Sequence, residues 1–166
     1  MLPLHPRIVH LPIALSVLMP LVTSGLLLAW WRGWLPRKAW AVAVALQLAL
    51  VVCGLVAIKT GEADEHQAET VVSERLIEAH EEAAKLLTAG AFVILLVAAG
   101  ALALRAEGAA RTVAALATAG TLAVLFLAYR TGEAGGRLVY VHGAARAWAP
   151  GAPGAPPRPA GDEEHH

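Results

Sequence analysis

Residues 86–104 read LLTAGAFVILLVAAGALAL, an apolar run that contains no Asp, Glu, Lys, Arg or His. A helix needs about 20 apolar residues to cross the hydrocarbon core of a bilayer, and the usual range is roughly 17–25. The run shows no alternation of polar and apolar residues, so it does not read as a strand of a barrel, the only other structure that crosses lipid. It therefore predicts a membrane-spanning helix.

Four runs of this kind predict an all-α membrane protein, a bundle of four transmembrane helices. They lie at about 8–31, 39–58, 86–104 and 112–129. The composition agrees, because 57% of the 166 residues are hydrophobic and only 16% are charged, whereas soluble domains carry about 25% charged residues. The formal net charge of zero indicates no nucleic-acid partner. Three glycines of the last two spans are expected to let those helices approach closely: Gly90, Gly100 and Gly120.

The connections between the spans define two ends. The tryptophan end holds the short turns 32–38 and 105–111 and the tryptophans Trp30, Trp31, Trp34 and Trp40. The histidine end holds the N-terminus, the longer connection 59–85 and the chain after residue 129. Basic residues are dense in the two short turns, which favours a cytoplasmic tryptophan end. Both termini are then expected on the periplasmic or outer side of a bacterial inner membrane.

Three further features are predicted at the histidine end. Within 64–85 apolar residues alternate with acids, which indicates an amphipathic helix on the membrane surface. Gly135-Gly136 predicts a sharp turn after the fourth span, with Leu138–Val141 pressed back onto the bundle. Residues 1–148 would form the transmembrane domain, and the Pro/Gly/Ala-rich segment 149–166 a disordered tail.

A repeated segment indicates two helical hairpins in tandem. Ile-Lys-Thr-Gly-Glu-Ala at 58–63 closes the second span, and Tyr-Arg-Thr-Gly-Glu-Ala at 129–134 closes the fourth. His10 opens the first span and His80 precedes the third at matching spacing. Two parallel copies would face each other about an axis along the membrane normal, which would bring His10 close to His80. A shared helix-ending signal, with glycine at the stop, is the alternative interpretation.

Five histidines at this end are candidate cofactor ligands, because ionisable residues beside a membrane are costly and indicate functional sites by default. His66 lies in the most polar stretch and is the weakest candidate. Local pairing with backbone or lipid headgroups is the alternative role for each of them. The five are His5, His10, His66, His80 and His142.

Two motifs resemble a known family. His-Pro-x-x-Val-His-x-Pro-Ile-Ala-Leu at 5–15 and Gly-Gly-x-Leu-Val-Tyr-x-His-Gly at 135–143, with a histidine leading the third span, are similar to bacterial four-span membrane proteins of domain of unknown function 2231. The resemblance covers about residues 4–145. Some members look fused or linked to Rieske or cytochrome c domains, which implies an electron-transfer setting. The matching histidines are His5, His10, His80 and His142.

We therefore expect a redox cofactor, and b-type haem is the favoured hypothesis, since haem iron takes axial histidines. His10 with His80 is the expected axial pair, and His5 with His142 is a second pair or its support. The chain has one cysteine, which excludes a Cys-x-x-Cys-His haem attachment. Two basic residues lie at the right depth to meet haem propionates or lipid phosphates: Arg130 and Arg137.

Two alternatives stay open. One is a Cu, Zn or Fe ion bound by imidazoles and carboxylates, for which the candidates are His5, His10, His80, His142, Glu62 and Glu133. The other is a structural subunit that anchors a soluble redox partner. No nucleophile, phosphate-loop or dinucleotide motif predicts an independent enzyme. The expected partners are the lipid bilayer, a periplasmic redox protein of the cytochrome c or Rieske type, and a second copy of the chain.

Overall fold

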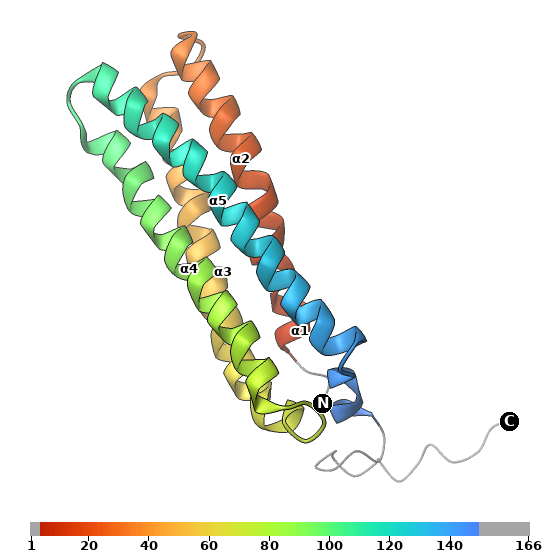
Figure 1. The fold of residues 1–166 in the computed structure, drawn as a ribbon. Coiled ribbons are helices and arrows are strands. Elements are labelled where there is room, and N and C mark those ends of the chain that lie inside the picture. The colour runs from red at the N-terminus through yellow and green to blue at the C-terminus, as the bar shows by residue number, and fades with distance from the viewer. Residues whose placement is uncertain (1–3, 150–166) are drawn as a thin grey trace, which may run out of the picture.

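The computed structural model describes residues 4–149, and every regular element in that range is a helix (Figure 1). The short α1 (His5–Ile8) precedes α2 (His10–Trp31), and two 3-10 helices lie before α3 and after α5. All four long helices are long and apolar enough to cross a membrane, which confirms the predicted all-α, four-span architecture. The remaining elements are η1 (Arg37–Trp40), α3 (Ala41–Ala68), α4 (Glu74–Ala103), α5 (Glu107–Tyr140) and η2 (Ala144–Trp148).

The long helices form a closed ring of contacts. Within the described residues α2 packs on α3 and α5, and α4 packs on the same two helices, with no diagonal contact. The hairpins α2–α3 and α4–α5 therefore lie side by side, as Figure 1 shows. This arrangement is consistent with the two tandem hairpins that the repeat predicts.

The helices extend well beyond the membrane at the histidine end. α3, α4 and α5 contain 28, 30 and 34 residues, so they are about 42–51 Å long, against about 30 Å for the hydrocarbon core. Their apolar parts end at 58, begin at 86 and end at 129. Most of the excess length is thus polar helix at one end, and it carries His66 and His80.

This extension replaces the predicted surface helix. Residues 59–68 continue α3 and residues 74–85 belong to α4, so only 69–73 connect the two helices. The prediction of a separate amphipathic helix in 64–85 was wrong. Adding a residue to an existing helix is easier than nucleating a new one, and here both long helices continue outward through the acidic segment.

The predicted turn at Gly135-Gly136 was also wrong. α5 runs through both glycines to Tyr140, and the chain turns at Gly143, whose φ is 73°. Tyr140 is 89% exposed, so the segment that follows the glycines does not press back onto the bundle. A glycine inside a helix costs only about 1 kcal/mol relative to alanine, which is too little to end a well-packed helix. The predicted tail, apart from Ala149, lies outside the described residues.

Two of the three expected glycine contacts are confirmed. A Cβ at Gly120 would lie 2.2 Å from Cδ1 of Ile94, and one at Gly90 would lie 3.1 Å from Cδ1 of Leu127. Gly100 differs, because its Cβ would meet Val113 at an ordinary 3.9 Å. α4 and α5 therefore approach most closely at mid-bundle, where small residues let helices pack in a membrane.

The tryptophan end is held by side chains that reach between helices. Nε1 of Trp30 donates to Oε1 of Glu107 at 2.6 Å, and Nε1 of Trp40 donates to the carbonyl oxygen of Ala98 at 3.0 Å. Both indoles are buried, whereas Trp31 and Trp34 are 70% and 69% exposed. Only half of the predicted tryptophan belt thus faces outward, because the other two rings close the end of the bundle.

Candidate functional site: a histidine pair at one end of the bundle

His5 lies at the start of α1 and is held against α3. Its Nδ1 lies 2.9 Å from the carbonyl oxygen of Ala57 and 3.4 Å from Oγ1 of Thr60. The Thr60 hydroxyl itself donates to the same Ala57 carbonyl at 3.0 Å. Because a carbonyl oxygen only accepts, Nδ1 is assigned as the protonated nitrogen. Nε2 of His5 therefore keeps its lone pair.

A glycine and a carboxylate complete the seat of His5. A Cβ at Gly61 would lie 3.3 Å from both Cε1 and Nδ1 of the ring, so the absent side chain makes room for the imidazole. The backbone N–H of His5 donates to Oδ2 of Asp64 at 3.3 Å. Residues 60 and 61 are the Thr-Gly of the first repeated segment. The repeat thus supplies the surface on which the ring packs.

His80 lies on α4 and is held against α5 in a similar way. Its ring lies close to the backbone of Thr131, the threonine of the second repeated segment. A Cβ at Gly135 would lie 2.9 Å from Cε1 of His80. The Thr131 hydroxyl donates to the carbonyl oxygen of Ala83 at 3.1 Å, which joins α5 to α4 beside the ring. Nδ1 of His80 is buried and has no hydrogen-bond partner among residues 4–149.

The two histidines face each other. Their ring centroids are 6.0 Å apart and their planes lie at 83°. Each ring is contributed by the first helical segment of one hairpin and packs on the second helix of the same hairpin. The two seats resemble each other without following the register of the sequence repeat, because neither His5 and His80 nor Gly61 and Gly135 occupy matching places in the two copies.

The expected pairing of His10 with His80 was wrong, because the structure puts His5 beside His80. The side chain of His10 is exposed. His10 follows His5 by five residues in one continuous helical stretch, which is about 140° around a helix of 3.6 residues per turn, so the two histidines of the first motif do not share one helical face. His5 was predicted to pair with His142, which is half-buried beyond the end of α5 and lines a different hollow, with Tyr140 and Arg146.

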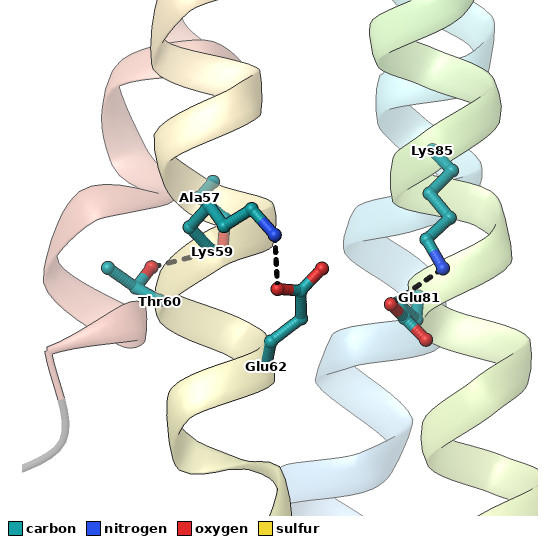
Figure 2. A network of polar contacts seen from close by, with 6 residues as sticks. All are labelled: Ala57, Lys59, Thr60, Glu62, Glu81 and Lys85. Carbon is teal, nitrogen blue, oxygen red and sulfur yellow. Dashed lines mark hydrogen bonds and ion pairs between the residues drawn. The ribbon is translucent and has the colours of Figure 1, made fainter.

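The predicted carboxylate ligands lie apart from the pair. Glu62 forms an ion pair with Lys59 at 2.7 Å, and Figure 2 shows it near the parallel pair Glu81–Lys85 on α4. Glu62 also acts electrostatically on Lys85. Glu133 is exposed on α5. These acids are engaged by lysines or directed away from the rings.

The remaining candidates are on the surface. The side chain of His66 is 99% exposed and lies 3.7 Å from Glu69, in keeping with its low rank. Arg130 and Arg137 are exposed. Across the part of the chain that the structure describes, no three His, Cys, Asp or Glu side chains gather as a metal site. The predicted cluster of three or four imidazoles with a carboxylate was therefore wrong.

Sequence reasoning missed the residues that seat the two rings. Thr60, Gly61 and Thr131 belong to the repeated segment, which was interpreted only as a helix-ending signal or a duplication mark. Gly135 was interpreted as a turn residue. The available signal was that each Thr-Gly pair is predicted at the histidine end of the bundle. Without a helix register, that coincidence does not show which histidine contacts which glycine.

By its fold and its site, the chain is an all-α membrane protein of four spans with a histidine pair at one end. The comparison with family models agrees, since residues 1–147 match the family described as Predicted membrane protein (DUF2231). The chain belongs to this family. Neither the curated proteins nor the solved structures contain a match. The side of the membrane that the histidine end faces stays a prediction.

Proposed function

We propose that this protein is a membrane electron-transfer component whose metal centre is held between His5 and His80. The observation that supports the proposal is the donor set. Nδ1 of His5 is hydrogen-bonded to the backbone carbonyl of Ala57, and the His80 ring lies close to the backbone of Thr131 while its Nδ1 has no partner among the described residues. Ligating histidines have this arrangement, because the bond from the other nitrogen orients the ring and raises its basicity.

The separation of the rings fits one metal between them. A metal bound at about 2.0–2.1 Å by two opposed imidazoles puts the ring centres roughly 6 Å apart, and the observed separation is 6.0 Å. Two protein ligands are enough for haem iron, because the porphyrin supplies the equatorial nitrogens. A b-type haem, bound without a covalent link, is therefore the group that this donor set suits first.

One observation favours a bare ion as a second candidate. The rings pack directly on helix backbone at Gly61 and Gly135, with ring atoms 2.9–3.3 Å from where a Cβ would lie at each glycine. A porphyrin would have to widen the space between the helices, whereas a single ion would not. Monovalent copper accepts two imidazoles as its whole ligand set, and imidazole is a suitable ligand for copper.

The electron acceptor that we propose is a soluble redox protein of the cytochrome c or Rieske type at the histidine end. The exposed Arg130 and Arg137 would give that end of α5 a positive surface for an acidic partner. Dimerisation of the chain stays a prediction.

The test is a reduced-minus-oxidised visible spectrum of the detergent-purified protein, produced with adequate haem supply, together with elemental analysis of the same sample. We expect a bis-histidine α band that His5→Ala and His80→Ala abolish to the same extent. His10→Ala is the matched control and should keep the band. Copper without a Soret band would favour the bare ion. A folded protein with neither haem nor metal would contradict the proposal.

A further inference from the structure

A shallow groove runs between α2 and α5 at the histidine end. Ile13 and Val17 line it on α2, and Leu125, Tyr129, Gly132 and Glu133 line it on α5. The lining is apolar apart from Tyr129 and Glu133. Ile13, Val17 and Tyr129 are 40%, 53% and 66% exposed, so the groove opens sideways toward the lipid.

Gly132 keeps the groove open at its polar end. A Cβ built at this position would have no heavy atom within 4 Å, so helix packing does not require a glycine here. Gly135, one turn further along α5, differs because its Cβ would meet His80 at 2.9 Å. The missing side chain at 132 therefore leaves free space on the groove side of α5.

Glu133 is the one carboxylate among the residues that line the groove. The described residues offer its carboxylate no hydrogen bond or ion pair. It lies four residues beyond the end of the apolar stretch at 129, which is about 6 Å of helix and corresponds to headgroup depth. An ionised carboxylate only accepts hydrogen bonds, and it repels a phosphate through like charge. The complementary ligand is a neutral lipid that carries a hydroxyl donor.

The groove and the histidine pair share one helix wall. The backbone of Thr131 lies close to the His80 ring, and Gly132 and Glu133 follow it directly on the groove side. An occupant of the groove would therefore lie across α5 from His80, and a helix with its side chains is about 10–12 Å wide.

We propose that this groove binds an isoprenoid quinol, with its ring hydroxyl donating to Glu133 and its tail lying along Val17 and Leu125. The choice of a quinol among hydroxyl-bearing lipids rests on the proposed function, because a quinol is the lipid-soluble class of electron donor. The apolar lining of the groove suits the lipid tail, and the Glu133 carboxylate suits a hydroxyl donor. The quinol ring would lie in the open space beside Gly132.

The test is an anaerobic calorimetric titration of decylubiquinol into the full-length protein in detergent micelles. Gly132→Leu fills the groove and is expected to weaken quinol binding at least about tenfold, which corresponds to a loss of about 1.4 kcal/mol of binding free energy. Gly25→Leu is the matched control, because Gly25 also lies in a span with no atom within 4 Å of its Cβ and does not line the groove. It should bind like the wild type.

Glu133→Leu is expected to weaken quinol binding about tenfold or more, since a hydrogen bond to a charged group is lost. Glu133→Gln keeps an acceptor oxygen and should lose less. The dimethyl ether of the same quinol has no hydroxyl donor and should bind the wild type as weakly as the quinol binds Glu133→Leu.

Three results would overturn the inference. These are equal quinol binding by wild type and Gly132→Leu, displacement of the quinol by phosphatidylglycerol, and a groove closed by a second copy, seen as a dimer that Gly132→Leu dissociates. The titration is repeated on His80→Ala, and haem and metal are measured on every sample. Quinol binding that survives in a protein without haem or metal would support the groove while contradicting the proposed metal centre. A wild-type protein that carries haem or metal but does not bind the quinol would contradict the groove and support the proposed metal centre.

Discussion

Gly135→Ala tests whether the histidine pair depends on a missing side chain in α5. The new methyl group would lie 2.9 Å from Cε1 and 3.4 Å from Nδ1 of His80. Carbon atoms in contact normally stay about 3.5–4.0 Å apart, so either the ring or the helix must move. A displaced ring moves away from the backbone of Thr131, which it now lies against.

The expected magnitude follows from two opposing effects. Inserting a methyl group into a packed interior costs about 1–3 kcal/mol. Replacing a helical glycine by alanine returns up to about 1 kcal/mol through helix propensity. Gly136→Ala is the matched control, because no heavy atom lies within 4 Å of its Cβ and it receives only the gain. We therefore expect Gly135→Ala to be less stable than Gly136→Ala by about 1–3 kcal/mol.

The assay is unfolding by SDS in mixed micelles, followed by the helix signal in circular dichroism. The free energy of unfolding of both variants is compared with that of the wild type. Spectra of any bound metal centre on the same samples report whether the ring has moved. If the two alanine variants unfold at the same SDS fraction and carry the same spectrum, the steric argument for Gly135 is refuted.

Two further predictions concern the rest of the bundle. Trp30→Phe removes the 2.6 Å hydrogen bond to Glu107 and should lower the free energy of unfolding by about 1.5–3 kcal/mol. The control Trp31→Phe changes an exposed side chain and should alter the free energy of unfolding by less than about 0.5 kcal/mol. Equal losses for the two variants in the SDS titration would contradict this prediction. Gly120→Ala puts a methyl group 2.2 Å from Cδ1 of Ile94 and should cost about 1–3 kcal/mol. Adding Ile94→Val, which removes that carbon, should restore part of the loss, and a double mutant no more stable than Gly120→Ala would show that the clash lies elsewhere.

The candidate site could be predicted only in part. The sequence identifies which residues are unusual, because histidines beside long apolar runs are readily recognised. It also places His5 and His80 at the same end, since four spans with short turns leave no other topology. The partner of each histidine depends on the rotation of α1 and α4 about their axes, and five residues of helix turn His10 about 140° away from His5.

The role of glycine shows the same limit. Gly135 and Gly136 look equivalent in sequence, and both were interpreted as a turn. In the structure the first packs against a ring and the second has open space around it. The difference comes from which face of α5 each presents to α4, and a step of one residue turns a helix by about 100° at 3.6 residues per turn.

The sequence by itself determined that this is a membrane protein with four helical spans and that its histidines share one end. Those properties follow from the cost of burying charge and unpaired backbone in lipid, which acts on every residue regardless of its distant neighbours. Only the tertiary structure decided that α3 and α4 continue beyond the membrane, that His5 rather than His10 meets His80, and that a groove opens at Gly132. These depend on the register and rotation of packed helices, where many weak side-chain contacts act together and no local pattern records the result.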